Sequence, residues 1–589
     1  MLITRVIAGL VLVGAILLSP QAVLASFLPA AYSHHFEYYV KGLTCFKGLV
    51  AFGALVALAV PGWVLSAFQN DPLLPGSDVR PQEKATDWAF VGILTVAACL
   101  LRLIHLRPSF TYDEVFLVKS LILQNPIRTL VHPSGSSHAL HTLLGNLSVR
   151  IFGMSEWSAR LPALLFGSAA PAMIFVFLKR QVSHRIGIIA AVLLLITPIH
   201  VWFSQEAKGN VPQIAMVLWS WICISSLCRR WNRMAAAGLV VALFLSALAH
   251  LSGITFIVGQ CLAVSLFSLK STRRADTSRC RGRLAGLHAI AFYLVMTYYS
   301  VISFFLIRGG QNVTAKEGAA GVGEILHDVF VRFTALDVSP AFLLPIVGIS
   351  LVGIIVLARE RRDLLALACL PFLLGVGIIV AAGLFSHARY HTFALPGLIL
   401  VVAAGVDGLW RLTLPESGAA RSVQLVGRAA ICVLLAFVIA VYVSALALYF
   451  RQPKSNLRQI AEFVAEAGAD LPVYVIGVNK KCYPALGMTY YMEKFHTDDT
   501  VESAITRSGD NAEIMIAVID TLHFTVGYKE LRPRLLQAGA ELARFSSLGE
   551  LDQYRVREST VYRVRVRDVA DAIRTENVAH RVTLPHDDS

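Results

Sequence analysis

Long apolar runs dominate this chain and limit what it can fold into. A helix needs about 20 apolar residues to cross the hydrocarbon core of a bilayer, which is roughly 30 Å thick. Runs of that length occur thirteen times, at 6–25, 46–68, 88–106, 160–178, 186–202, 211–228, 234–250, 253–269, 285–307, 340–357, 364–384, 393–409 and 429–449. Only 15% of the residues are charged, which is too few to cover a water-soluble globule of 589 residues. The sequence predicts a mainly α, polytopic membrane helix bundle with about 13 transmembrane helices.

The first apolar run has two interpretations. Arg5, the apolar stretch and the ending Val23-Leu24-Ala25 also fit a secretory signal. A cleaved signal and a retained first span both place residue 30 outside. The orientation of the later helices is therefore the same under both interpretations.

Basic residues indicate which loops are cytoplasmic. The chain has a net charge of +14, and its hydrophobic part carries the excess. Together, 18 Lys and Arg side chains occupy five short loops, at 179–185, 229–233, 270–283, 359–363 and 410–428. The positive-inside rule assigns these loops to the cytoplasm of a multi-pass protein in the cytoplasmic (inner) membrane. This use of the charge predicts a lipid bilayer as partner and no nucleic acid.

The opposite side of the membrane then receives the other loops. They are 107–159, 203–210, 308–339 and 385–392, together with everything after 450. The predicted domains are two additional N-terminal spans in 1–87, a transmembrane catalytic domain in 88–449 and a soluble extracytoplasmic domain in 450–589. The last is predicted to be a small α/β domain, with a helix at 456–467, strands at 473–477 and 514–519, and an edge hairpin at 553–565.

Two adjacent carboxylates, Asp113 and Glu114, follow the third apolar run almost immediately. Charge this close to hydrocarbon is costly, which favours a functional role. The structural alternative is a helix N-terminus with Thr111 as its cap and both acids in the first turn, where they stabilise the helix dipole.

Three histidines occur in the same external loop, at His132, His138 and His141. Residues 138–152 have helical amphipathic spacing, which predicts an interfacial helix in this loop. His138 and His141 lie one turn apart on it. Such a pair without a third ligand is usually not a metal site, so hydrogen bonding of His138 to an anionic or sugar group is the preferred interpretation.

Two further external loops carry polar residues. The loop at 203–210 contains Gln205, Glu206 and Lys208, for which the alternative is a solvated hairpin with a snorkelling lysine. The loop at 385–392 brings Arg389 and Tyr390 to the same side, where an interfacial anchor is the alternative.

A lipid-linked phosphate explains why acids, histidines and cations gather on one external surface of an otherwise apolar chain. The lipid would lie among the helices, and Lys208 and Arg389 would neutralise its phosphate. Asp113 would act as a base toward an acceptor hydroxyl.

These motifs resemble the family 39-type glycosyltransferases of the membrane-embedded GT-C class, which include protein O-mannosyltransferases and lipid A aminoarabinose transferases. The resemblance extends from about 88 to 410. The matching motifs are Tyr112-Asp113-Glu114, Ile151-Phe152-Gly153, Glu156, Arg160-Leu161-Pro162, Phe203-Ser204-Gln205-Glu206-Ala207, Arg389-Tyr390 and Pro396.

The resemblance implies a GT-C-like fold and transfer of a monosaccharide from a polyprenyl-phosphate sugar to an envelope glycan, lipid or protein on the external face. Asp113 and Glu114 are the implied catalytic residues, with Glu114 in a supporting role. The implied substrate-binding residues are His138, Gln205, Glu206, Lys208, Arg389 and Tyr390. The lipid-linked sugar is the donor substrate, no cofactor is assigned, and a divalent metal ion is left open.

Two other classes of function fit part of the pattern. A lipid or sugar transporter or flippase also needs spanning helices and a few charges, although transporters tend to place ionisable groups near the middle of the membrane. A non-catalytic membrane scaffold predicts that removal of residues 455–589 abolishes function while Asp113 is dispensable.

Overall fold

The computed structural model describes residues 2–27, 36–60, 62, 67–68, 85–133, 138–267, 277–308, 319–334, 343–413, 421–451, 455–467, 473–477, 513–519, 539–547 and 557–565. These residues divide into two compact units. The first unit is Met1–Leu103, Pro126–Gly145 and Leu161–Val443, and the second is Ile104–Asn125, Asn146–Arg160 and Ser444–Ser589. The domain boundaries predicted from the sequence, at 87 and 449, stay predictions.

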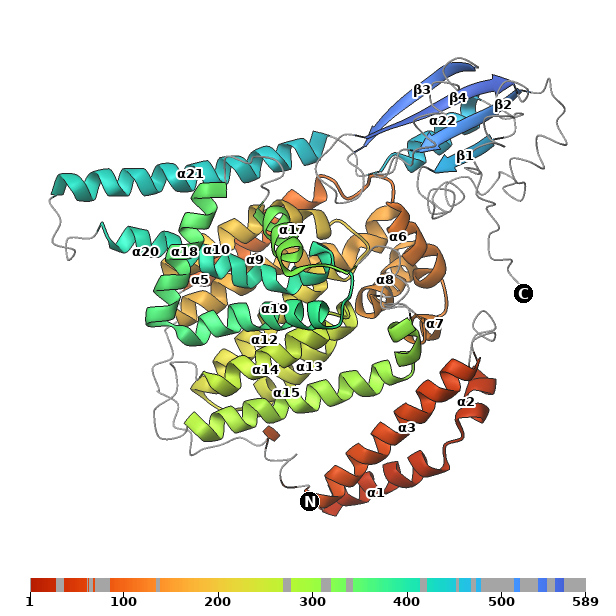
Figure 1. The fold of residues 1–589 in the computed structure, drawn as a ribbon, viewed down its shortest axis with the longest axis vertical. Helices are drawn as coiled ribbons and strands as arrows, with labels where there is room; N and C mark the ends of the chain where they lie inside the picture. The colour runs from red at the N-terminus through yellow and green to blue at the C-terminus, as the bar shows by residue number, and fades with distance from the viewer. Residues whose placement is uncertain are drawn as a thin grey trace. The chain divides into compact units, whose positions relative to one another are not determined.

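Helices make up most of the described chain, which confirms the mainly α prediction (Figure 1). They are α1 (Leu2–Leu17), α2 (Pro20–Phe27), α3 (Phe36–Ala59), α5 (Ala85–Leu103), α6 (Tyr112–Leu117), η2 (Val118–Ile122), α7 (Pro126–Leu130), α8 (Ala139–Phe152), α9 (Glu156–Gln181), α10 (His184–Ile196), α11 (Pro198–Phe203), α12 (Asn210–Arg229), α13 (Arg233–Ala249), α14 (Gly253–Leu266), α15 (Thr277–Ser300), α17 (Val322–Thr334), α18 (Leu343–Glu360), α19 (Arg362–Ala381), η6 (Ala388–Ala394), α20 (Leu395–Arg411), α21 (Arg421–Arg451) and α22 (Leu457–Ala467).

Seven helical segments in the described residues are long and apolar enough to cross a membrane. They are Phe36–Ala59, Ala85–Leu103, Glu156–Gln181, Asn210–Arg229, Arg362–Ala381, Ala388–Arg411 and Ser422–Arg451. Shorter apolar helices lie at Thr4–Leu17, His184–Ile196, Arg233–Ala249 and Gly253–Leu266. A polytopic helix bundle is thus confirmed, whereas the number thirteen stays a prediction. The helix predicted at 138–152 is also present, as α8, and its position at the membrane interface stays a prediction.

Two predicted spans are each divided by a proline. The run at 6–25 forms α1 and α2, which restarts at Pro20, and the run at 186–202 forms α10 and α11, which restarts at Pro198. Thr197 has an extended backbone, with ψ at 118°. Proline disfavours the helical conformation in the residue before it, so the helix ends there and a new one begins. Hydropathy alone does not register this interruption.

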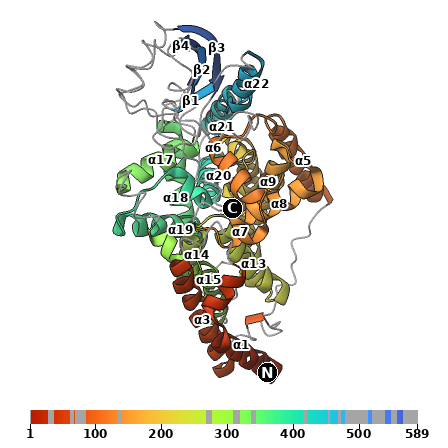
Figure 2. The same cartoon turned by 90° about the vertical axis from the view of Figure 1, so that its right-hand side faces the viewer.

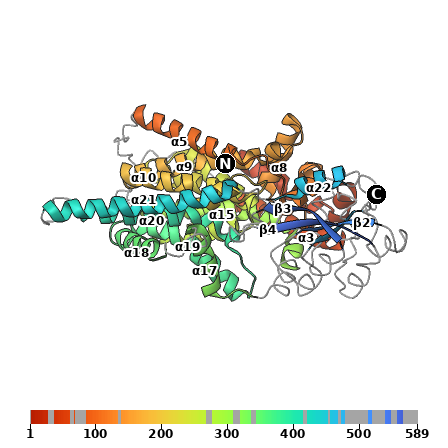
Figure 3. The same ribbon diagram turned by 90° about the horizontal axis from the view of Figure 1, so that it is seen from above.

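Within the first unit, several helices pack against two neighbours each. Helix α13 contacts both α12 and α15, and α14 contacts both α15 and α19 (Figures 1 and 2). Helix α20 lies between α10 and α18 (Figure 3). Gly353 of α18 and Gly405 of α20 allow this close approach, because a Cβ at either position would lie within about 2 Å of a backbone oxygen of the facing helix.

The second unit contains a four-stranded sheet formed by β1 (Val473–Gly477), β2 (Glu513–Ile519), β3 (Gly539–Ser547) and β4 (Arg557–Arg565). The strand order is β1-β2-β4-β3, with β1 parallel to β2 and β4 antiparallel to both β2 and β3. Two of these strands and helix α22 lie where the sequence predicts them.

The prediction of an edge hairpin at 553–565 is wrong. Its described part, β4, is one interior strand, which pairs with β2 on one side and β3 on the other. Val561 and Tyr562 are buried, while Arg563 forms an ion pair with Glu513 of β2. Alternating charged and apolar residues indicate a strand, and they occur in central antiparallel strands as well as at edges. Strand β3 was not predicted.

Candidate functional site

The acidic pair Asp113 and Glu114 lies in the first turn of α6, in the second unit. Thr111 is the N-cap residue, and its backbone N–H and its hydroxyl both donate to Glu114 Oε2, at 2.9 and 3.2 Å. A side-chain acceptor at this position satisfies a backbone N–H that no helical carbonyl reaches. The predicted cap is confirmed, and it fixes the backbone on which Asp113 stands.

Glu114 is also paired with Arg160 of α9. Arg160 Nε donates to Glu114 Oε1 at 2.8 Å and Nη2 donates to Oε2 at 2.7 Å, and both side chains are fully buried. This two-point geometry is the strongest that a guanidinium makes with a carboxylate. A buried carboxylate needs such a partner, because burying an unpaired charge is costly. The sequence motif contained Arg160, but the pairing itself was not predicted.

Arg160 additionally fixes the chain that leads into α6. Its guanidinium packs over the ring of Phe110, 5.1 Å from the ring centre. Its terminal N–H groups donate to three backbone oxygens, those of Leu106, Pro108 and Ser109, at 2.9, 2.7 and 3.2 Å. By these contacts Glu114 and Arg160 position the preceding loop and the first turn of α6. Asp113, which is half-buried, lies in that turn.

In the first unit, the turn between α11 and α12 is buried. Lys208 is 3% exposed, and its Nζ lies 3.6 Å from Glu206 Oε2. Glu206 Oε1 accepts a hydrogen bond from Trp202 Nε1 at 2.5 Å. The alternative of a solvated hairpin with a snorkelling Lys208 is therefore wrong. A buried lysine is tolerated here because a carboxylate lies beside it.

The segment that carries Arg389 and Tyr390 is attached to the start of α12. Asn210 Nδ2 donates to the backbone oxygen of Arg389 at 2.9 Å. The same segment is also held by Asp328 of α17, whose Oδ2 accepts from the backbone N–H of Ala388 at 2.6 Å. Asn210, which follows Lys208 and Gly209, therefore holds η6. The segment with Lys208 and the segment with Arg389 thus lie together.

His138 lies immediately before α8 and joins the same region. Its Nδ1 is 3.0 Å from the backbone oxygen of Ala249, which only accepts, so Nδ1 carries a proton. Its ring centre is 5.4 Å from that of His250, whose ring centre is in turn 5.9 Å from that of Tyr390. The backbone of His138 has a positive φ of 44°, which is uncommon for a residue other than glycine.

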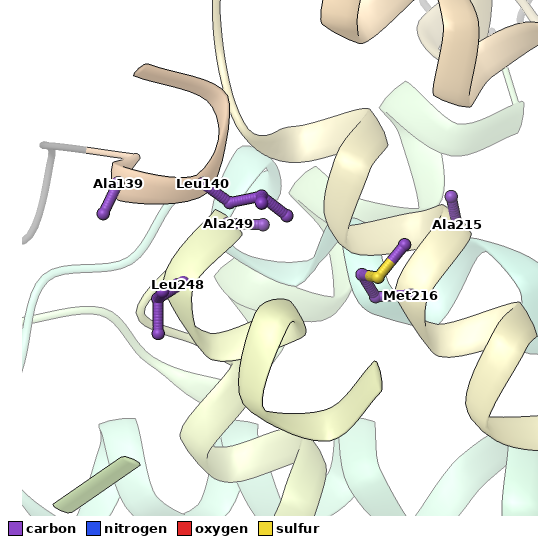
Figure 4. Close-up of a cluster of buried hydrophobic side chains, with 6 residues drawn as sticks. All are labelled: Ala139, Leu140, Ala215, Met216, Leu248 and Ala249. Atoms are coloured by element: carbon purple, nitrogen blue, oxygen red, sulfur yellow. The ribbon is translucent and has the colours of Figure 1, made fainter. Parts of the chain in front are cut away.

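A cluster of apolar side chains holds the first turn of α8 next to α12 and α13 (Figure 4). It consists of Ala139, Leu140, Ala215, Met216, Leu248 and Ala249. Ala139 follows His138, and Ala249 supplies the oxygen that His138 contacts. Burial of this cluster stabilises the backbone around His138, so the position of the histidine does not depend on the hydrogen bond to Ala249 alone.

Gly209 permits this close packing, and its replacement is predicted to be disruptive. A Cβ at residue 209 would lie 1.8 Å from the Ala249 oxygen and 3.0 Å from His138 Nδ1. We expect Gly209→Ala to separate the turn from α13 and to lower thermal stability in detergent by several degrees. Gly92→Ala is the matched control, since nothing lies within 4 Å of a Cβ there. Equal melting temperatures for the two variants would contradict the close approach.

The other two histidines of the external loop have different surroundings. Burial, assisted by the neighbouring charge of Arg128, lowers the pKa of His132 to about 4, so this ring is neutral near pH 7. His141 is fully buried within α8. Among the described residues, no group of three or more His, Cys, Asp and Glu side chains is placed to hold a metal ion. Dependence on a divalent metal stays an open prediction.

The structure therefore brings six of the eight predicted site residues into one unit and two into the other. His138, Gln205, Glu206, Lys208, Arg389 and Tyr390 lie in the first unit, and Asp113 and Glu114 lie in the second. Sequence reasoning missed His250, Asn210 and Asp328, which hold the first group together. His250 ends an apolar run and precedes a turn, a position that alone suggested no role.

Comparison with known proteins supports part of the predicted resemblance. The model of the family described as dolichyl-phosphate-mannose-protein mannosyltransferase matches residues 138–304. That segment includes His138 and the turn with Gln205, Glu206 and Lys208. A search of curated proteins finds no match to the chain.

Several solved structures are similar at low identity. ArnT from Cupriavidus metallidurans in the apo state has 14% identity and a TM-score of 0.43, covering 83% of this chain and 99% of that one. An apo Archaeoglobus fulgidus oligosaccharyltransferase has 11% identity and a TM-score of 0.45, covering 74% and 70%. Arabinofuranosyltransferase AftD from Mycobacteria has 14% identity and a TM-score of 0.42, covering 81% and 40%.

Over residues 138–304, the family match confirms the resemblance to protein mannosyltransferases that the sequence motifs predict.

Proposed function

We propose that this protein is a membrane glycosyltransferase that transfers a monosaccharide from a polyprenyl-phosphate sugar to an acceptor hydroxyl. The observation that carries the proposal is the family match over residues 138–304, because it covers the buried turn with Gln205, Glu206 and Lys208. A helix bundle with several candidate spans supplies the membrane setting that a polyprenyl carrier requires.

The roles proposed for these residues are those of a single-displacement mechanism. The acceptor oxygen attacks the anomeric carbon as the bond from that carbon to the phosphate oxygen breaks, which inverts the configuration. Asp113 takes the proton of the acceptor hydroxyl. Lys208 and Arg389 stabilise the negative charge on the departing polyprenyl phosphate. Glu114 does not take part directly, because both of its oxygens accept hydrogen bonds from Arg160.

Several binding roles complete this proposal. His138, which donates from Nδ1 to the backbone oxygen of Ala249, hydrogen-bonds to the anionic or sugar part of the donor. Gln205 and Glu206 lie within the buried turn next to Lys208, and Tyr390 stacks with the Arg389 guanidinium at 5.6 Å.

The basic loops support a location of the chemistry on the external face of the cytoplasmic membrane. Along the chain, the loops that contain Asp113, Lys208 and Arg389 alternate with the basic loops, which predicts that they lie on the opposite side of the membrane. The proposed acceptor is accordingly an envelope glycan, a lipid or a protein on that face.

Purified protein in nanodiscs with a radiolabelled undecaprenyl-phosphate monosaccharide tests the proposal. Membrane extract supplies the acceptor, and label is expected to move from the lipid to a new product only when the protein is present. A parallel mass analysis of envelope glycans, with the gene removed and restored, identifies sugar and acceptor. Movement of intact labelled lipid across the bilayer without a new glycoside would instead support a flippase.

A further inference from the structure

Arg102, at the last turn of α5, is fully buried and lies against the turn that carries Gln205 and Lys208. Its Nε donates to Ser204 Oγ at 2.9 Å, and its Nη2 is 2.7 Å from His200 Nδ1. Its own backbone oxygen accepts from Gln205 Nε2 at 2.7 Å. One residue therefore contacts the turn through both its side chain and its backbone.

The contact with His200 fixes the protonation of that ring. A guanidinium only donates, so His200 Nδ1 accepts and the ring is neutral with its proton on Nε2. Ser204 Oγ in turn donates to the His200 backbone oxygen at 2.5 Å. Arg102, His200 and Ser204 thus form a closed hydrogen-bonded set at the end of α11.

Space for this set is provided by Gly167 of α9. A Cβ at residue 167 would lie 2.2 Å from Ser204 Oγ and 3.1 Å from Arg102 Nε. The guanidinium of Arg102 therefore fits between α9 and α11 only because residue 167 has no side chain.

The charge of Arg102 has no carboxylate partner among the described residues. Its side-chain contacts are neutral: Ser204, His200 and the backbone oxygen of Ala98, at 3.0 Å from Nη1. A buried ion pair such as Arg361 with Asp363, in the same unit, shows how a buried arginine is otherwise compensated. Burying a cation without a carboxylate partner lowers the stability of the fold. A contribution to stability therefore does not explain the burial of Arg102.

We propose that Arg102 is a positioning residue for binding of the lipid-linked phosphate, acting through Ser204 and Gln205 on the turn that carries Lys208. It holds this turn in one conformation, and its weakly screened charge favours an anion nearby. Arg102 does not touch the substrate. The inference rests on the proposed function, because it assigns the turn to the anionic carrier.

Three variants and a control test this role. Arg102→Gln removes the charge, Arg102→Lys keeps it with fewer donors, and Ser204→Ala removes only the bridging hydroxyl. Arg361→Gln is the matched control, because it also removes a buried arginine of the first unit but leaves the turn intact. Measurements are binding of undecaprenyl phosphate in nanodiscs, KM and kcat for the labelled donor, and hydrogen exchange of residues 203–210.

We expect Arg102→Gln to weaken binding and raise KM by about tenfold, with a smaller fall in kcat. Arg102→Lys should recover part of the loss, Ser204→Ala should show a weaker form of it, and both Arg102→Gln and Ser204→Ala should increase exchange in residues 203–210. Arg361→Gln should lower thermal stability without changing KM.

Wild-type binding and KM in both Arg102→Gln and Ser204→Ala would overturn the inference, and Ser204→Ala keeps it testable if Arg102→Gln does not fold. An equal rise in KM for Arg361→Gln would reduce the effect to general destabilisation and would also overturn it. A wild-type protein that neither binds undecaprenyl phosphate nor transfers sugar from it would instead reject the proposed function.

Discussion

Replacement of Asp113 by asparagine is expected to lower kcat for sugar transfer by about 10²- to 10⁴-fold, the range typical for loss of a general base. The amide has nearly the shape of the carboxylate but does not accept the acceptor proton. Because Glu114 holds the same turn through Arg160 and Thr111, the backbone of the variant should be unchanged. Transfer from the labelled lipid donor by purified protein measures the effect, with melting temperature as the check on folding.

Asp87→Asn provides the control for Asp113. Asp87 is a buried carboxylate at the start of α5 that pairs with Lys179, and it has no place in the proposed chemistry. Its loss should lower stability and leave kcat of the folded protein near that of the wild type. An Asp113→Asn protein that retains most of the wild-type turnover would reject Asp113 as the base, even if sugar transfer itself is confirmed.

Loss of Arg160 should produce the largest change in stability. Arg160→Met leaves the carboxylate of Glu114 buried without its partner, and breaking a buried pair in this way costs about 3–5 kcal/mol. The variant also loses the hydrogen bonds to the loop before α6. We expect a lower melting temperature in detergent, a protease-sensitive 104–118 segment and a fall in transfer, because Asp113 stands on that segment.

Two further variants distinguish the effect of the buried Glu114–Arg160 pair on stability from that of losing any one ion pair. Arg458→Met removes an ion pair with Glu156 in the same unit, but this arginine is partly exposed, so its loss should cost at most about 1 kcal/mol. The double variant Glu114→Gln with Arg160→Met removes both charges and should be more stable than Arg160→Met alone. If Arg160→Met destabilises the protein no more than Arg458→Met does, the buried pair is not the main anchor of the loop.

Local patterns in the sequence predicted the parts of the fold that depend on near neighbours. Thr111 as cap and Asp113 and Glu114 in the first helical turn follow from a Thr-x-x-Glu spacing, and this is what the structure contains. The long apolar runs likewise gave most helices. The break at Pro20 was missed because a hydropathy window averages over a single residue.

Contacts between distant segments were much harder to predict. Glu114 and Arg160 are 46 positions apart, and Asn210 and Arg389 are 179 apart, so no spacing rule links them. Lys208 was assigned to the correct turn, but its burial depends on helices from elsewhere in the chain. Strand β4 looked like an edge because alternation reports exposure of a face and not the number of neighbouring strands.

Pro198 also determines which insertions the turn between α11 and α12 can accept. Each residue added to a helix rotates everything after it by about 100°, and an uninterrupted helix through 196–203 would connect α10 rigidly to the residues that follow. Because the chain restarts at Pro198, the orientation of α11 is set by its own contacts rather than inherited from α10. An insertion within α10 would therefore be absorbed at Thr197, whereas one within α11 would rotate Gln205 away from Arg102 and disconnect the turn from α5.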